Sequence, residues 1–306
     1  MKKNSLFTIF LLCLLFLFSC GNNNVPEDND SGKTQDFSNE GYFDYAEIPD
    51  FDGETAYVTV NGNKPFFNKT DRIKTAFENY GKLDNLGRCT TASANISKKL
   101  MPTKKRENIG TVKPTGWQIA QYDCVEGSFL YNRCHLIGYQ LTGENANERN
   151  LITGTRFLNT QGMLPFENMV ADYIKETGNH VLYRVTPIFE GREVIARGVL
   201  MEGFSVEDGG EGICFNVFCY NAQPDVEIDY LTGKSKYIGK EIPSDTDEIE
   251  DNKDVRLYVL NTNSKRIHKP NCQSVEDMDD MNRLAYRGSI EELRDMGYKS
   301  CGSCKP

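Results

Sequence analysis

Three neighbouring segments decide the fold that we predict for this chain. They read YNRCHLIGY (residues 131–139), NLITGTRFLN (150–159) and GMLPFENMV (162–170). The apolar run at 129–131 predicts a strand that ends at His135, and Leu151–Ile152 predicts a second short strand after a polar loop. The second strand leads into helical segments that carry Asn159 and Glu167. This strand, loop, strand and helix would bring one His, one Asn and one Glu into a single cleft.

These three residue types suit one kind of chemistry. A neutral imidazole, here that of His135, can take a proton from water near neutral pH. The amide oxygen of Asn159 and the carboxylate of Glu167 are hard ligands of the kind that Mg²⁺ prefers, and such an ion polarises a phosphoryl oxygen. A single histidine is more often structural, so the combination of the three residues carries the prediction.

The stretch resembles the DNA/RNA non-specific endonucleases of the ββα-metal superfamily, in particular the streptococcal DNA-entry nucleases and streptodornases. Their signature is Asp-Arg-Gly-His, followed after a loop by an Asn-rich strand-to-helix segment and a Glu. Here the signature stands as NRCH (132–135), residues 150–159 and Glu167. The resemblance covers residues 55–240.

Two residues depart from the family pattern. Asn132 stands in place of the usual Asp, and Cys134 stands in place of the usual Gly. The Asp is a supporting residue in that family, so its replacement bears on the positioning of the site more than on the reaction.

The resemblance implies phosphodiester hydrolysis in DNA and in RNA with Mg²⁺ or Mn²⁺ as cofactor. It implies that His135 is the general base and that Asn159 and Glu167 hold the metal, with Glu167 acting directly or through water. Enzymes of this family leave 5′-phosphate ends. Arg133 and Arg156 are candidates for binding phosphate oxygens, and Asn150 for bracing the hairpin.

A second interpretation assigns the chain to another class. The two departures, Asn132 and Cys134, leave open a surface lipoprotein that binds nucleic acid for capture or uptake, with a weakened active site. A purely structural envelope protein would leave the coincidence of His135, Asn159 and Glu167 unexplained.

The N-terminus predicts export. Two lysines precede an apolar run at 6–18, which is followed by small residues and Cys20. Residues 17–20 (LFSC) resemble a bacterial lipobox, which implies a lipid on Cys20 and a cell-surface or membrane-anchored lipoprotein outside the cytoplasm. An ordinary secretory peptide and a retained signal anchor are the alternatives.

The charges are divided unevenly along the chain. Residues 27–54 hold ten Asp or Glu against one Lys, so we predict that 21–54 is a disordered acidic tether. Residues 55–240 hold 22 Lys or Arg and 20 Asp or Glu, a net charge of +2, although the whole chain carries −9. The predicted nuclease domain is therefore near neutral. We expect a modest basic groove, whose positive charge comes from clusters such as 104–106.

The predicted domain, 55–240, is of the α+β class, with a mostly antiparallel sheet and flanking helices. Its predicted elements are a strand at 57–60, a helix at 71–80, an extended segment at 86–96 and an antiparallel meander at 180–189, 194–206 and 213–220.

Residues 241–254 predict a second acidic linker, and 255–306 a small separate module. We expect a strand at 256–260, a helix at 275–286 and a second helix that starts at Ser289, where Glu292 completes a capping box. A unit of this size has a thin core and usually needs a disulfide or a metal.

The module carries four candidate zinc ligands: His268, Cys272, Cys301 and Cys304. Their His-x₃-Cys and Cys-x₂-Cys spacing suits a tetrahedral zinc site. The segment resembles the zinc-binding module of the Ada DNA-repair protein, in which four cysteines hold the metal. The alternative is a disulfide from Cys272 to Cys301 or Cys304 with one thiol left over, which export would favour.

Pairing among the remaining cysteines of the predicted mature chain is not deducible from the sequence. Cys214 and Cys219 are five residues apart in one predicted strand, so they should face opposite sides of the sheet and not bond each other.

Overall fold

The computed structural model describes residues 43–239, 256–278 and 282–306, which belong to one compact unit. The predicted signal at 1–20, most of the predicted tether and the predicted linker at 241–254 lie outside the described residues. Within the described ranges, no helix is both long and apolar enough to cross a membrane.

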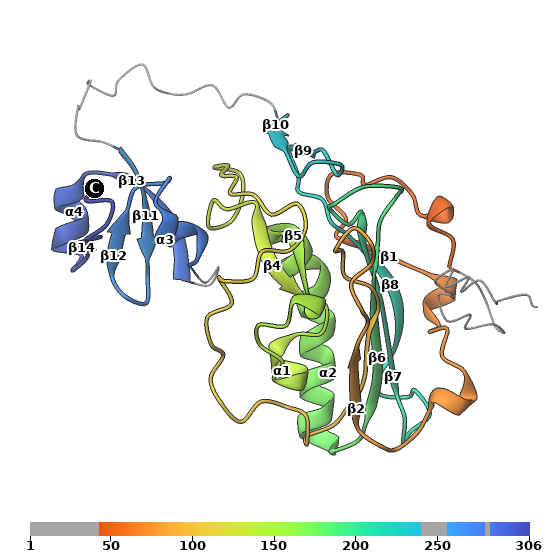
Figure 1. Ribbon diagram of the computed structural model, residues 1–306. Coiled ribbons are helices and arrows are strands. Elements are labelled where there is room, and N and C mark those ends of the chain that lie inside the picture. Colours follow the sequence, from red (N-terminus) through yellow and green to blue (C-terminus); the bar gives the residue numbers. More distant parts are fainter. Residues whose placement is uncertain (1–42, 240–255, 279–281) are drawn as a thin grey trace, which may run out of the picture. The chain divides into compact units, whose positions relative to one another are not determined.

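The main element is a six-stranded antiparallel sheet in the order β1-β8-β7-β6-β3-β2 (Figure 1). Its strands are β1 (Tyr57–Thr59), β2 (Phe77–Tyr80), β3 (Ala92–Ile96), β6 (Val181–Ile188), β7 (Gly198–Ser205) and β8 (Cys214–Tyr220). Three of them, β6, β7 and β8, form the predicted meander. The fold is therefore α+β and mostly antiparallel, as the sequence predicts.

Alternation along β8 shows how the two faces of the sheet are used. Phe215, Val217 and Cys219 point into the main core, whereas Phe218 and Tyr220 belong to a separate cluster on the opposite face. Successive side chains of a strand point to opposite faces, so a strand buried on both sides is apolar along most of its length.

Helix α2 (Leu164–Thr177) covers the inner face of the sheet, and the hairpin of β4 (Tyr131–His135) and β5 (Leu151–Thr155) lies on the far side of this helix (Figure 1). The short helix α1 (Tyr139–Thr142) follows β4. One cluster of buried side chains joins the hairpin, α2 and the sheet, so the ββα unit is fixed to the sheet by the main core.

The last part of the predicted tether contributes to the opposite face. Residues 45–47 form a 3₁₀ turn, and Phe43, Tyr45, Ile48 and Phe51 pack against Phe218 and Tyr220. Although this segment is acidic, its aromatic residues bury apolar surface, so the packed body begins before residue 55.

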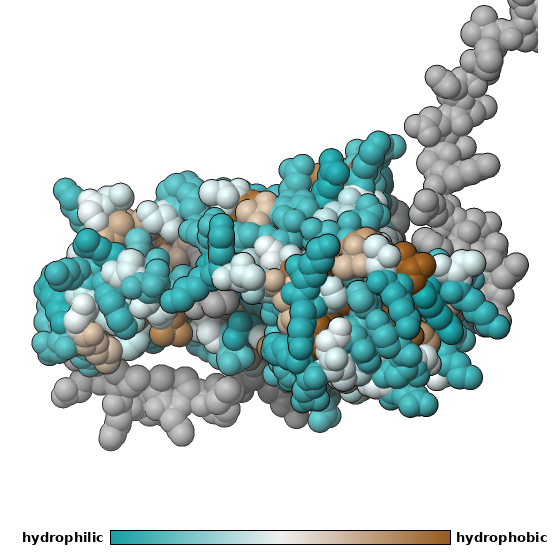
Figure 2. All heavy atoms as spheres, turned by 90° about the horizontal axis from the view of Figure 1, so that it is seen from below, coloured by the Kyte–Doolittle hydropathy of each residue, from teal (hydrophilic) through white to brown (hydrophobic). Residues whose placement is uncertain are grey.

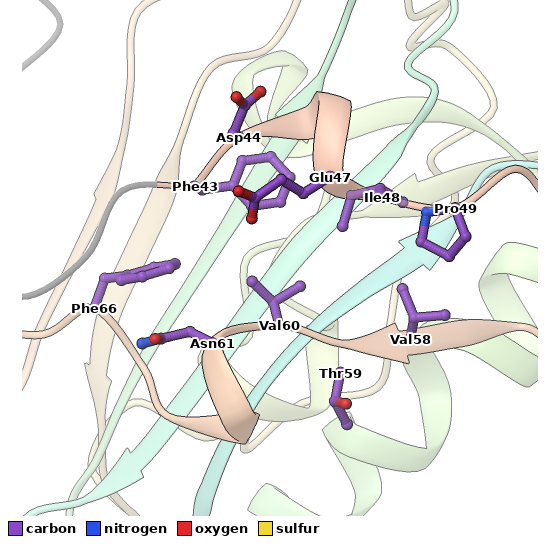
Figure 3. Close-up of a pocket in the computed structure, with 10 residues that line it drawn as sticks. All are labelled: Phe43, Asp44, Glu47, Ile48, Pro49, Val58, Thr59, Val60, Asn61 and Phe66. Carbon is purple, nitrogen blue, oxygen red and sulfur yellow. The ribbon is translucent and has the colours of Figure 1, made fainter.

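A pocket of about 420 Å³ lies between this segment and β1 (Figure 3). Phe43, Ile48, Val58 and Phe66 contribute apolar surface, and the carboxylates of Asp44 and Glu47 lie on one side of it. None of the predicted site residues lines this pocket, so it is separate from the predicted chemistry.

The predicted helix at 71–80 is wrong. The structure has a 3₁₀ turn at Lys69–Asp71 and then the edge strand β2, which pairs with β3. The apolar residues of this segment have helical spacing, but the segment pairs with β3 instead. A local pattern cannot reveal this pairing, because the partner strand lies elsewhere in the sequence. The predicted extended segment at 86–96 contains a strand only over Ala92–Ile96.

Residues 226–237 form a small hairpin of β9 (Val226–Ile228) and β10 (Ser235–Tyr237).

The C-terminal module has the strand order β13-β11-β12-β14, with β11 at Arg256–Asn261, β12 at Arg266–His268, β13 at Arg283–Gly288 and β14 at Lys299–Ser300. Its helices are α3 (Gln273–Glu276) and α4 (Ile290–Asp295).

The predicted capping box is confirmed: Ser289 accepts from the Glu292 backbone, and the Glu292 side chain accepts from Ser289. The predicted helix at 275–286 is wrong, because α3 ends at Glu276 and residues 283–288 pair with β11 along its whole length. Isolated apolar residues at helical spacing also fit a strand, and pairing with β11 decides between the two.

The face of the protein seen in Figure 2 is mostly hydrophilic, with separate hydrophobic spots between polar side chains. The most exposed large apolar residues of the described chain include Leu231 and Ile238, at the β9–β10 hairpin, and Met296 of the C-terminal module. Single exposed apolar residues are ordinary in soluble domains.

Candidate active site

The hairpin pairs β4 with β5 in antiparallel register, with His135 opposite Leu151 and Asn132 opposite Gly154. Cys134 is fully buried in the main core. A Cβ at position 154 would overlap with the Cys134 sulfur. Glycine on β5 therefore makes the room that the larger residue on β4 needs, and the departure from the family pattern at Cys134 is accommodated.

His135 ends β4 and is 7% exposed. Its Nε2 lies 2.8 Å from the Asn145 backbone oxygen. A carbonyl oxygen only accepts hydrogen bonds, so Nε2 carries the hydrogen and the neutral ring has Nδ1 as its basic nitrogen. The loop after β4 therefore fixes the tautomer and the orientation of the ring.

Asn159 lies in a π-helical turn, Leu158–Met163, that runs directly into α2. The backbone N–H of Leu164 donates to the carbonyl of Asn159. Pro165 cannot donate a backbone hydrogen bond, so the wider turn before it lets the helix continue without a break. Pro165 is the second residue of α2, where its missing backbone N–H costs no helical hydrogen bond.

The amide of Asn159 is oriented by β4. Its Nδ2 donates to Asn132 Oδ1 over 3.3 Å. With the nitrogen directed towards Asn132, the Asn159 Oδ1 is the atom left to act as a metal ligand. Asn132 thus accepts a hydrogen bond at the position where the family has a carboxylate.

Glu167 is a buried carboxyl in the first turn of α2. Burial raises its pKa from 4.5 to about 7, while hydrogen bonds from Gln140 and the Gly138 backbone and the charge of Arg106 oppose the rise. A Cβ at position 138 would lie 2.6 Å from Glu167 Oε2, so only glycine lets the chain after β4 approach the carboxylate this closely. Gly138, three residues after His135, therefore lies against Glu167.

Arg106 is a residue of this site that the sequence did not single out. It lies close enough to Glu167 to lower that carboxyl's pKa. The next residue, Glu107, donates its backbone N–H to Asn145 Oδ1, and the Asn145 carbonyl holds His135. The only signal in the sequence is the basic cluster 104–106, which resembles a solvated loop.

Arg133 is not placed for the predicted contact with substrate phosphate. Its side chain is 2% exposed and its guanidinium donates to the backbone oxygens of Val112, Gly110 and Glu276 at 2.6–2.7 Å. It also stacks 3.9 Å from the centroid of the Trp117 ring. These contacts occupy the guanidinium N–H donors that a phosphate would need.

Asn150 and Arg156 differ in exposure. Asn150 is fully buried, and its side chain both accepts from the Ile137 N–H and donates to the Ile137 carbonyl, which braces the loop after β4. Arg156 begins the helical segment one turn before Asn159. Its Nε is buried without a hydrogen-bond partner, and its Nη2 lies 3.4 Å from exposed Glu126.

The second candidate metal site is the Cys/His cluster, by which we mean His268, Cys272, Cys301 and Cys304. One possible ligand atom from each residue lies within 4.8 Å of all the others. Parallel pairing of β12 with β14 brings Cys301 beside His268, and the Cys301 N–H donates to the Ile267 carbonyl. The fold thus brings the two pairs of residues together, so that their four donor atoms lie close to one another.

The chemistry of the Cys/His cluster fits a metal ion. The buried His268 Nδ1 has no hydrogen-bond partner, and burial lowers the pKa of this imidazole. Backbone N–H groups of Cys304 and Ser303 lower the pKa of Cys301 to about 7, which favours its thiolate. All three cysteines are free thiols in the structure, as are Cys89, Cys124, Cys134, Cys214 and Cys219.

Cys214 is exposed and Cys219 is buried, in agreement with their opposite faces. His180 Nδ1 lies 2.7 Å from Glu207 Oε1, and its backbone N–H donates to the same carboxylate, so this histidine has a structural partner.

The fold and the hairpin match known nucleases. Residues 68–206 match the family model of the DNA/RNA non-specific endonucleases. Two solved structures of NucA from Streptococcus agalactiae are similar, one with a magnesium ion bound (25% identity, TM-score 0.52) and one with no metal bound (26%, 0.51). They cover 58% of this chain and 85% and 86% of their own. A search of curated proteins found no match.

The site and these similarities define a metal-dependent nuclease built on a ββα hairpin. Residues 68–206 form a domain of the DNA/RNA non-specific endonuclease family.

Proposed function

We propose that the chain is an exported, Mg²⁺-dependent endonuclease that hydrolyses phosphodiester bonds in DNA and in RNA without sequence specificity. The observation that carries the proposal is the orientation of the Asn159 amide, whose nitrogen is directed to Asn132 so that its oxygen can meet a cation.

The donor set fits Mg²⁺ or Mn²⁺. An amide oxygen and a carboxylate are hard donors, and two protein ligands leave most positions for water and substrate oxygens. Burial raises the pKa of Glu167 because the surrounding groups do not fully compensate its charge, and a divalent cation would supply that compensation. When bound, the ion would neutralise charge on the leaving oxygen and the phosphoryl group.

His135 supplies the base. Its Nδ1 takes the proton from the water that attacks phosphorus, while the bond from Nε2 to the Asn145 carbonyl keeps the ring in place and stabilises the imidazolium. The product would carry a 5′-phosphate, as in the family that the chain resembles.

Arg106 and Arg156 are the better candidates for phosphate binding. The charge of Arg106 acts on Glu167, and Arg156 lies one helical turn before Asn159 with an unpartnered buried Nε. One planar guanidinium group can donate two parallel hydrogen bonds to two oxygens of the same phosphate. Arg133 instead serves the structure, and Asn150 braces the hairpin.

The remaining parts of the proposal concern location and the module. We retain the predicted lipid on Cys20, which would tether the enzyme outside the cytoplasm, together with the domain order signal, tether, nuclease, linker and module. The Cys/His cluster would hold structural Zn²⁺, because its four soft or borderline donor atoms lie within 4.8 Å of one another.

The test is cleavage of supercoiled plasmid by the purified protein with Mg²⁺, with EDTA, and with Mg²⁺ restored in excess. We expect nicking and linearisation that EDTA abolishes and Mg²⁺ restores, and the same dependence with RNA. DNA retarded in a gel but uncut under all three conditions would support the alternative, a nucleic-acid-binding lipoprotein for capture or uptake.

A further inference from the structure

The C-terminal module makes buried contacts with the catalytic strand. Arg283 on β13 is 6% exposed, and its Nη2 donates to the Tyr131 carbonyl of β4 over 3.1 Å. The same guanidinium lies 4.2 Å from the centroid of the Phe129 ring. A buried charged group that donates to the backbone of another element fixes the distance between the two elements.

Helix α3 of the module holds Arg133. The carbonyl of Glu276, the last residue of α3, accepts from Arg133 Nη2 at 2.7 Å. The Glu276 carboxylate lies 2.8 Å from Lys113 Nζ, in the loop whose Gly110 and Val112 carbonyls also hold Arg133. The Arg133 guanidinium is therefore shared between the nuclease domain and the module.

The backbones also meet closely. A Cβ at Gly110 would overlap with the carbonyl of Asp277, although the φ of Gly110 is one that any residue adopts. Phe129 and Ile119 of the nuclease domain pack in one cluster with Val275 and Met278 of the module. The contact thus combines apolar packing with hydrogen bonds to backbone oxygens.

A short covalent path joins this contact to both candidate metal sites. Cys272 of the Cys/His cluster is the N-cap of α3, four residues before Glu276. Arg133 is two residues before His135 on β4, on the same face of that strand. A metal held by Cys272 therefore fixes the start of the helix whose end holds the strand of the general base.

We propose that the C-terminal module positions the catalytic strand, and that the metal in its Cys/His cluster maintains this position. Arg283 and the Glu276 carbonyl act as positioning groups, since they touch Arg133 and β4 but not the reacting atoms. This rests on the proposed function, because it assigns the module a part in the same reaction. Loss of the metal should lower kcat more than it raises KM, because the groups that would be displaced position β4 and do not bind the nucleic acid.

Trp117 gives a readout that is independent of activity. It is the only tryptophan of the chain, and its ring lies 3.9 Å from the Arg133 guanidinium and 5.7 Å from that of Arg283. Its fluorescence should therefore change whenever the module leaves β4.

The experiment uses the full-length protein and three variants: Arg283→Met, which removes the contact; Gly110→Ala, which wedges the two backbones apart; and Arg287→Met, an exposed control on the same strand. We expect the first two to lower kcat about tenfold, to alter Trp117 emission and to leave the zinc content at one per chain. The control should match the parent protein.

Removal of zinc by a zinc-selective chelator in excess Mg²⁺ should produce the same two changes, and added Zn²⁺ should reverse them. Unchanged kcat and unchanged Trp117 emission in Gly110→Ala, Arg283→Met and the zinc-free protein would overturn the proposal. If the parent protein shows no nuclease activity, the proposed function fails, and the response of Trp117 still decides whether the module and its metal hold β4.

Discussion

The two candidate metal sites of this protein differ in how they are closed. The nuclease site offers an amide oxygen and a carboxylate from one helical run, eight residues apart, and a histidine on β4 whose tautomer is fixed. The Cys/His cluster offers four donors from two separate pairs within 4.8 Å. An open set suits an exchangeable, catalytic ion, whereas a closed set suits a permanent, structural one.

The two sites also differ in what orients the donors. In the nuclease site, hydrogen bonds from side chains and from the loop after β4 direct the groups. In the Cys/His cluster, strand pairing between β12 and β14 does so. Substitutions in the first site should therefore act on the reaction directly, whereas those in the second should act on the stability of the module and, through the position of β4, on kcat.

The largest effect should come from His135→Ala. Loss of the general base should lower kcat by about 10²–10⁴-fold in plasmid cleavage, without a change in the circular dichroism spectrum. The matched control is His180→Ala, since His180 pairs with Glu207 and takes no part in the site. Activity near that of the parent protein in His135→Ala would refute the assignment of the base.

Asn159→Ala should lower kcat by about 10²-fold, equivalent to about 3 kcal/mol of transition-state stabilisation. The reason is loss of the oxygen that Asn132 directs towards the cation. Titration of activity with Mg²⁺ should show a higher half-saturating concentration. An unchanged Mg²⁺ dependence would show that the metal lies elsewhere.

Glu167 should link stability to pH in the metal-free protein. Burial raises its pKa from 4.5 to about 7, so the folded protein keeps a proton that the unfolded chain releases. Its contribution to the free energy of unfolding is full below pH 4.5 and falls by about 3 kcal/mol as the pH rises through 7.

Urea denaturation in EDTA between pH 4.5 and 8 checks this prediction. Glu167→Gln should lack this part of the pH dependence, and Mg²⁺ should reduce it in the parent protein because the ion stabilises the carboxylate. Parallel pH profiles of the two proteins would contradict the assignment.

Arg106→Ala should lower kcat/KM by about tenfold or more, because a charge-assisted pair with phosphate is worth about 1.5–3 kcal/mol. Lys105→Ala is the control, since Lys105 is the exposed neighbour in the same basic cluster. Equal losses in both variants would indicate a general electrostatic effect rather than a specific contact.

The smallest effect should come from Asn132→Asp, which restores the family residue. A charged acceptor would strengthen the bond from Asn159 Nδ2 by about 1 kcal/mol, which corresponds to about a fivefold rise in kcat. A fall in kcat would show that Asn132 has become adapted to this site.

Local signals in the sequence predicted much of this architecture. The β-meander, the hairpin with His135 at a strand end, and the capping box at Ser289 depend on patterns within about ten residues. The helices predicted at 71–80 and 275–286 failed because strand partners far along the chain decide those segments.

The sequence could predict which residues form the site, but not how the residues around them are buried and paired. A motif can name His135, Asn159 and Glu167, but it cannot show that Arg133 is buried under Trp117. Nor can it show that Arg106, twenty-nine positions before His135, lies near Glu167. Both facts depend on how the loop before β4 folds back, and no local pattern determines that.

The most direct test of the two-site account is crystallography of the full-length protein soaked with Mn²⁺, with anomalous maps recorded at the manganese and zinc edges. We predict a manganese peak between Asn159 and Glu167, close to His135, and a separate zinc peak within the Cys/His cluster. Absence of manganese from the first position, with the ion bound only elsewhere, would contradict the account.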